Sequence, residues 1–126
     1  MYIAKKLTGV TFTEAIEKVT EDLKVEEFGL LTEIDVKATL KKKLDAGFRN
    51  YVILGFCNAP FAHKALTLND KVGVLLPCNV IVQELDDAVE VFAMDPAAFM
   101  ANDPNKELAG LAMDVSETLK KVINGL

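Results

Sequence analysis

The chain has 126 residues and a formal net charge of −5 at pH 7, and 51% of its residues are hydrophobic, which is high for a soluble domain. This length fits a single domain over residues 1–126, with a core that needs no disulfide staples. The acidic balance argues against a nucleic-acid partner, because phosphate binding requires concentrated Lys and Arg. No apolar stretch approaches the ~20 residues of a membrane span, and the N-terminus lacks the apolar core of a signal peptide. We therefore expect a cytoplasmic protein with reduced thiols and no membrane partner.

The N-terminal part of the chain predicts a strand followed by a helix. Residues 1–7 have the pattern of a short opening strand. Thr11 and Glu14 have the spacing of a capping box, in which Thr11 caps the helix and Glu14 reaches back to it. Apolar residues then recur at helical spacing: Phe12, Ile16, Val19 and Leu23. We expect this helix to end near Glu26.

A second strand over residues 28–34 is predicted to lead directly into a second helix. Alternation places four side chains on one side of this strand: Phe28, Leu30, Thr32 and Ile34. Asp35 is suited to cap the helix, and Gly47 is suited to stop it. Three apolar side chains of the helix are expected to face inward: Val36, Leu40 and Leu44. Glu33 and Asp35 share one side of the strand, as paired acid and base groups require, but capping and solvation explain them better.

Two matching elements, ILGFCN at 53–58 and VLLPCN at 74–79, hold the only two cysteines of the chain. The continuous apolar run over residues 51–57 predicts a central strand covered on both faces. Pro60 is well placed as the first residue of a third helix. Strand character resumes over residues 72–85, but Pro77 removes a ladder donor. That strand is therefore expected to begin at Cys78 or to be bulged there.

The C-terminal part of the chain predicts a hairpin and then a long helix. Asp86 and Asp87 make a tight turn into a strand over residues 89–94. The pairs Asp95-Pro96 and Asp103-Pro104 each resemble a cap followed by a proline at the first helical position. Apolar residues between positions 108 and 122 recur at helical spacing, which predicts an amphipathic closing helix. The only serine, Ser116, is expected on the exposed side of this helix.

The predicted order is strand–helix–strand–helix–strand–helix–strand–strand–helix. This order favours an α+β domain built on a mixed or antiparallel five-stranded sheet, with the helices mainly on one face. The other face of the sheet would then stay apolar and open. Its burial against a second copy would explain the high hydrophobic content, and a symmetric homodimer is the simplest such arrangement.

Several blocks of the sequence, in order, resemble the bacterial and archaeal domain-of-unknown-function family 302. They are FGLLTEIDVKATLKKKL, FRNYVILGFCNAPFAHKAL, VGVLLPCNVIV and the AMDP at 93–96. The resemblance covers about residues 5–100 and preserves the spacing between the blocks. It implies a small α+β protein that is seen as a homodimer, with no established catalytic activity. It therefore implies no catalytic residues for this chain.

The candidate site lies where the strand over residues 51–57 ends and the strand after Pro77 begins. Five side chains are expected to line one pocket there: Cys57, Asn58, His63, Cys78 and Asn79. An apolar or amphipathic small molecule is the expected ligand. This favours a small binding or accessory domain over an enzyme, with no cofactor. Asn79 has a second interpretation, in which its amide is buried and stabilises the kink at Pro77.

Two other functional classes remain open. Cys57 and Cys78, with His63 as a third ligand, are residue types that bind a soft metal, so a thiol-based metal-binding or redox protein is one alternative. A nucleophilic role for Cys57 at a helix N-terminus belongs to the same class, with His63 as the candidate base. The other alternative is a purely structural dimeric adaptor. Free cysteines are, however, often buried simply as small hydrophobic residues.

Overall fold

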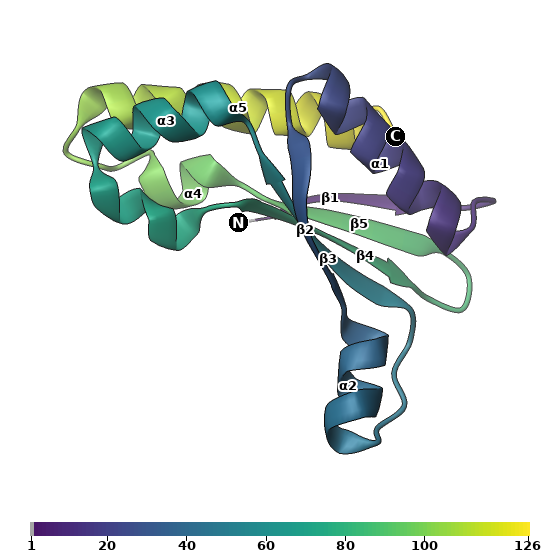
Figure 1. Ribbon diagram of the computed structural model, residues 1–126. Coiled ribbons are helices and arrows are strands. Elements are labelled where there is room, and N and C mark those ends of the chain that lie inside the picture. The colour runs from purple at the N-terminus through teal and green to yellow at the C-terminus, as the bar shows by residue number, and fades with distance from the viewer. Residues whose placement is uncertain (1) are drawn as a thin grey trace.

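One five-stranded antiparallel sheet organises residues 2–126, which are the residues that the computed structural model describes (Figure 1). Its strands are β1 (Tyr2–Leu7), β2 (Gly29–Asp35), β3 (Tyr51–Cys57), β4 (Cys78–Glu84) and β5 (Val89–Met94). Their order across the sheet is β1-β5-β4-β3-β2, so β1 and β2 are the two edges. The predicted α+β class and the five strands are confirmed. Met1, which the sequence assigned to the first strand, lies outside the described residues.

The helices divide into a layer over one face of the sheet and one projecting helix. Their bounds are α1 (Phe12–Val25), α2 (Val36–Leu44), α3 (Ala59–Leu68), the 3-10 helix η1 (Asp70–Leu75), α4 (Pro96–Met100) and α5 (Lys106–Asn124). Helices α1 and α5 pack against the sheet, and α3 lies alongside α5 and η1. Helix α2 instead projects away from this layer, below the sheet in Figure 1. The predicted one-sided cover of the sheet is confirmed.

The core lies between the helical layer and the covered face of the sheet. In β4 every second side chain is buried, because successive side chains of a strand point to opposite faces: Cys78, Val80 and Val82. The same alternation holds in β5. Helix α5 contributes a buried stripe at helical spacing, including Leu108, Ala112, Leu119 and Ile123. The face that lacks this cover is called the open face below.

The capping residues predicted for the first two helices are confirmed. Glu14 N donates a hydrogen bond to Thr11 Oγ1 at 3.0 Å, and Thr11 N donates to Glu14 Oε1 at 2.9 Å. Hydrogen bonding of the Glu14 carboxyl, first to the Thr11 backbone N–H and then to the Thr11 side chain, lowers the pKa of that carboxyl. Asp35 Oδ1 accepts from Ala38 N at 2.9 Å. The predicted stop at Gly47 is wrong, because α2 ends earlier, where Asp45 adopts a left-handed conformation with φ of 51°.

Helix α2 lacks the buried face that its sequence predicted. No residue of Val36–Leu44 is buried, and 71% of the Leu44 side chain is exposed. The helix contacts mainly the flanking strands β2 and β3. The prediction that Val36, Leu40 and Leu44 face inward is therefore wrong for Leu44, and Val36 and Leu40 are only half-buried, because the helix projects beyond the helical layer.

Three predictions about the strands are corrected by the structure. A bulge between Leu30 and Thr32 places Leu30 opposite Phe56 and Thr32 opposite Gly55. The side chains of Leu30 and Thr32 therefore lie on opposite faces of the sheet, because one extra residue reverses the alternation. Strand β3 is covered mainly on one face, since Tyr51, Ile53 and Cys57 on the other face are half-buried and only Gly55 there is buried. Residues 72–75 belong to η1 and not to a strand, although β4 begins at Cys78 as predicted.

The C-terminal segment differs from its prediction in how α5 begins and how it is packed. Asp95 caps α4 as expected, accepting from Ala97 N at 3.0 Å. Helix α5 is capped by Asn105 instead of Asp103, which lies too far upstream. Ser116 is buried and not exposed, and its Oγ donates to Asp95 Oδ1 at 2.6 Å. This bond ties the middle of α5 to the start of α4.

Gly55 marks the point where three segments meet most closely. A Cβ atom at this position would clash with Thr32 Oγ1 of β2 and would lie 2.7 Å from Pro77 Cγ. Neither neighbour is the end of a long flexible side chain, so the backbone would have to move. Gly55 therefore allows β2 and the segment before β4 to approach β3.

We predict that Gly55→Ala lowers the free energy of unfolding by about 1–3 kcal/mol, because it overpacks this contact. Gly110→Ala is the matched control, since Gly110 lies in α5 with nothing within 4 Å of an added Cβ. The control should be more stable by about 0.5–1 kcal/mol. Urea unfolding followed by circular dichroism measures both changes. Equal stability of the two variants would contradict the close contact at Gly55.

Candidate functional site

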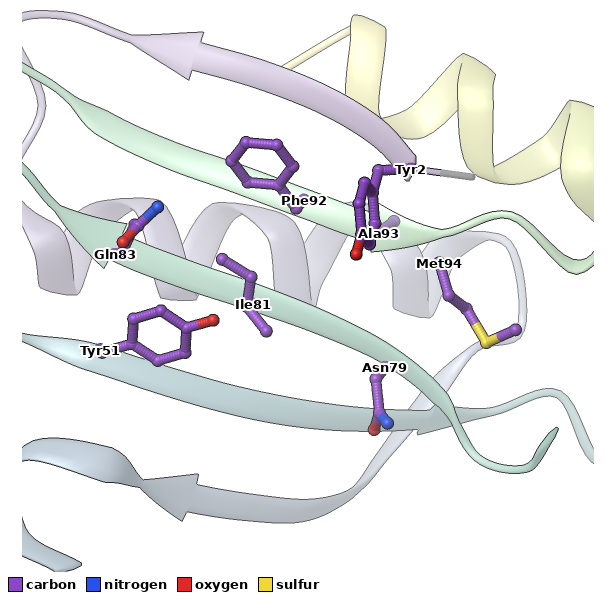
Figure 2. A pocket seen from close by; sticks show the side chains of 8 residues that line it. All are labelled: Tyr2, Tyr51, Asn79, Ile81, Gln83, Phe92, Ala93 and Met94. Carbon is purple, nitrogen blue, oxygen red and sulfur yellow. The ribbon is translucent and has the colours of Figure 1, made fainter. Parts of the chain in front are cut away.

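The open face of the sheet carries a depression of about 330 Å³. Its lining comes from four adjacent strands, and the side chains are shown together in Figure 2. They are Tyr2 of β1, Tyr51 of β3, Asn79, Ile81 and Gln83 of β4, and Phe92, Ala93 and Met94 of β5. The volume lies at the lower end of the range for small-molecule sites. This depression is called the open-face pocket below, and it is the candidate site.

Aromatic and aliphatic side chains form most of the pocket wall. The rings of Tyr2 and Phe92 meet edge to face, with centroids 6.1 Å apart and an interplanar angle of 89°. Ile81 lies opposite Phe92 on β5 and opposite Ile53 on β3, so it occupies the centre of the open face. The exposed fraction of Tyr2 is 69%, which leaves much of this ring free to contact a ligand or a partner.

Polar groups with unused hydrogen-bonding capacity line the same pocket. Within residues 2–126, the Asn79 amide and the hydroxyl groups of Tyr2 and Tyr51 have no hydrogen-bond partner. Asn79 is exposed at the start of β4, so the alternative in which its buried amide stabilises the kink at Pro77 is wrong. An amide with a free donor and a free acceptor can bind a ligand that offers both.

Gln83 connects two opposite charges at one end of the pocket. Arg49 Nε donates to Gln83 Oε1 at 2.8 Å, and Gln83 Nε2 donates to Glu90 Oε1 at 3.0 Å. The Arg49 guanidinium also lies 4.4 Å from the centroid of the Phe48 ring and 5.9 Å from that of Tyr51. Cation–π contact and hydrogen bonding thus hold this end of the pocket in place.

A second depression adjoins the open-face pocket at its other end. Asn79 and Met94 line both depressions. Val74 and Phe99 line the second one, and they are 88% and 45% exposed. The apolar surface therefore continues from the sheet onto η1 and α4. Contiguous apolar surface of this kind is typical of a binding or association surface.

The register separates the two cysteines by face. Cys78 lies opposite Phe56, whose side chain is in the core, and Cys78 itself is only 3% exposed. Cys57 follows Phe56 in β3 and is half-buried, so alternation directs it to the opposite face. The predicted proximity holds for the strands, which are neighbours, but the two thiols are not side by side in one pocket.

Burial also changes the chemistry of Cys78. Desolvation, followed by a smaller contribution from the nearby Cys57, raises the pKa of the Cys78 thiol to about 11. Cys78 is therefore held as a neutral thiol in the physiological pH range. A protonated thiol is neither a good nucleophile nor a metal ligand.

Asn58 and His63 lie on the helical side of the structure, away from Asn79. Asn58 caps α3, with its Oδ1 accepting from Phe61 N at 3.0 Å. It borders a different depression, between α3, α5 and the turn before β2. His63 is exposed on α3. The five residues predicted to line one pocket are thus distributed over several surfaces, and Asn79 alone lines the open-face pocket.

The metal alternative has no matching cluster in the described residues. Within residues 2–126 no group of three or more His, Cys, Asp or Glu side chains is arranged to hold a metal ion. Cys57, Cys78 and His63 do not converge, because one thiol is in the core and the histidine is on the surface of α3. No helix of the same residues has the length and apolar composition to cross a membrane.

The sequence and fold place the chain among known proteins. The sequence model described as "Domain of unknown function DUF302" matches residues 3–126. The chain belongs to the DUF302 family. A crystal structure of an uncharacterized conserved DUF302 protein from Bacillus stearothermophilus is similar, with a TM-score of 0.85 and 27% identity. The similarity covers 97% of this chain and 96% of that chain. No curated protein matches this chain.

Most residues of the open-face pocket in this DUF302 chain were missed by the sequence-based prediction. Tyr2, Tyr51 and Phe92 come from three strands that are far apart in sequence, and only pairing brings them together. One signal was available. In β4 and β5 small apolar residues alternate with larger or polar ones, among them Asn79, Gln83, Glu90 and Phe92, which indicates that one face of these strands lacks a core partner.

We predict that native protein has one reactive thiol per chain, Cys57. At about pH 8, a pKa raised from 9.0 to about 11 lowers the thiolate fraction of Cys78 by about 100-fold, and burial slows its reaction further. A colorimetric thiol reagent should therefore modify one cysteine quickly and the second only after unfolding. In Cys57→Ser the native protein should be unreactive, whereas Cys78→Ser should keep one fast thiol. Two fast thiols in the native protein would contradict this assignment.

Proposed function

We propose that this DUF302 chain is a cytoplasmic homodimeric binding domain whose open sheet face pairs with a second copy and encloses a small-molecule pocket. The observation that carries the proposal is the uncovered face of the sheet, where apolar and aromatic side chains surround the pocket. Both cysteines are free thiols, which is the state that a reducing compartment maintains.

The exposed apolar residues support a second copy as the partner on this face. Tyr2 and Ile34, at opposite edges of the sheet, are 69% and 48% exposed, and Phe92 and Ile81 between them are half-buried. Covering such residues removes apolar surface from water and is favourable by about 25 cal/mol per Å². An isologous dimer buries the same patch on both chains, so one apolar face is enough to form it.

The projecting helix α2 supports the same arrangement. It carries Lys37, Lys41, Lys42 and Lys43, whereas the chain as a whole has a net charge of −5. A basic projection on an acidic protein is complementary to a second copy of that protein. None of its apolar residues is fully buried within the chain, and Leu44 is 71% exposed, so a neighbouring chain would cover them further.

Dimer formation would also complete the pocket. A ligand on a sheet surface is covered from one side only, whereas small-molecule sites typically bury 70–90% of the ligand surface. A second sheet across the open face would supply the missing wall. In this arrangement dimer formation and ligand binding favour each other. The second sheet covers the side of the ligand that a single chain leaves exposed, and the ligand covers apolar side chains of the pocket.

Light scattering after size exclusion tests the dimer. We expect the unmodified protein to have twice the chain mass of 13.8 kDa. Ile81→Lys places a charge at the centre of the open face and should reduce the mass to that of one chain. The matched control is Met113→Lys, at a 49% exposed apolar position on α5, which should remain dimeric. A monomeric unmodified protein, or a dimer lost only in the control, would refute the proposed interface.

The ligand part of the proposal has its own measurement. Native mass spectrometry of the dimer, purified without heating or denaturant, should detect a bound small molecule that is absent from Ile81→Lys. Circular dichroism should show that this variant stays folded. A dimer that repeatedly shows no bound molecule, and no response to small-molecule probes, would support a structural adaptor instead.

A further inference from the structure

The chemistry of the open-face pocket defines a class of ligand. Building on the proposed function, we infer that this pocket binds an uncharged planar molecule that carries an amide-like edge, and that Asn79 pairs with that edge. The inference concerns the ligand class, which the dimer proposal leaves open. Three features of the pocket lead to it.

The first feature is the absence of charge from the pocket lining. Among the described residues that line the pocket, none carries a carboxylate, ammonium, guanidinium or imidazole group. An ionised ligand would lose its hydration there without gaining a charge partner, which is costly. The net charge of −5 further disfavours anions near this surface. The lining therefore favours a neutral ligand.

The second feature is the way in which the nearest charges are already paired. Arg49 and Glu90 lie at the end of the pocket, and both are bonded to Gln83, at 2.8 and 3.0 Å. The Arg49 guanidinium also rests over the ring of Phe48. A ligand carboxylate would compete with these contacts to reach Arg49. Gln83 thus links the two charges to each other and limits their availability to a ligand.

The third feature is a group of three aromatic rings on the same face as a free amide. The rings of Tyr2, Phe92 and Tyr51 flank the depression. Ile81 lies between Phe92 and Tyr51, and Met94 lies at the end where Asn79 is found (Figure 2). Aromatic walls favour flat partners through stacked or edge-to-face contacts. Asn79 is on the same face, with its donor and acceptor unused within residues 2–126. A primary amide or lactam edge satisfies both groups at once.

Benzamide and benzoate test this inference because they have the same size and shape and differ in charge. Titrations of each into isotopically labelled protein near neutral pH are followed by nuclear magnetic resonance at the Asn79 side-chain amide. Millimolar affinity is expected for molecules of this size. We expect benzamide to shift the Asn79 amide resonances and benzoate to bind about tenfold more weakly.

Two variants separate direct recognition from a general effect. Asn79→Ala should weaken benzamide binding about tenfold, since a hydrogen-bonded pair is lost. The Tyr2 and Tyr51 ring resonances report binding in this variant, and both tyrosines of the chain line the pocket. Asn102→Ala is the matched control, at an exposed asparagine in the turn after α4, and should bind benzamide as the unmodified protein does.

Each outcome bears on the inference. If benzoate binds as tightly as benzamide or more tightly, the inference of a neutral ligand is overturned. If that benzoate binding is then lost in Arg49→Gln, Arg49 is the group that binds the anion. No response at the pocket to either probe would overturn the planar ligand. An unchanged affinity in Asn79→Ala would remove Asn79 as the recognising group. Light scattering on the same samples keeps the proposals distinct, because a dimer that prefers benzoate contradicts only this inference, whereas a monomer contradicts the proposed function.

Discussion

The pairing of β3 with β4 is the constraint on which the rest of the structure depends. Phe56 lies opposite Cys78 and Gly55 opposite Asn79, so one pair enters the core and the next reaches the open face. A shift of one residue would exchange the two faces of the whole strand. It would expose Cys78 and bury the Asn79 amide without a partner. Burial of Phe56 and Cys78 therefore fixes Asn79 on the open face, and with it the polar end of the pocket.

The close approach of neighbouring segments at Gly55 links the register of β3 and β4 to the position of the edge strand β2. Thr32 and Pro77 both lie over Gly55, one from β2 and one from the segment that enters β4. The bulge after Leu30 brings Thr32 onto this side. A bulge, a glycine and a proline thus act together, and each would be unfavourable alone in a sheet. Together they hold the edge strand and its projecting helix α2 at a defined place beside the open face.

Local features of the chain could be predicted from the sequence, whereas the site depended on long-range pairing. The capping box at Thr11, the cap at Asp35 and the start of β4 after Pro77 each rest on interactions within a few residues. The pocket is lined by several strands, and the sequence pattern predicts these strands without predicting their order in the sheet. Its aromatic residues were therefore missed. The prediction that Ser116 is exposed was wrong for a similar reason. Its partner Asp95 is brought to it only by the packing of α4 on α5.

The energetics of α2 give independent support for a covering partner. Isolated helices shorter than about 12–15 residues are marginal in water, and α2 spans Val36–Leu44 without a buried side chain. Its cap at Asp35 and its ion pair between Lys41 and Asp45 are exposed, and exposed pairs contribute at most about 1 kcal/mol. Basic side chains and the exposed Leu44 on one short projection are better stabilised against an acidic neighbour than in solvent. The same neighbour, seated on the open face, would cover the aromatic wall of the pocket.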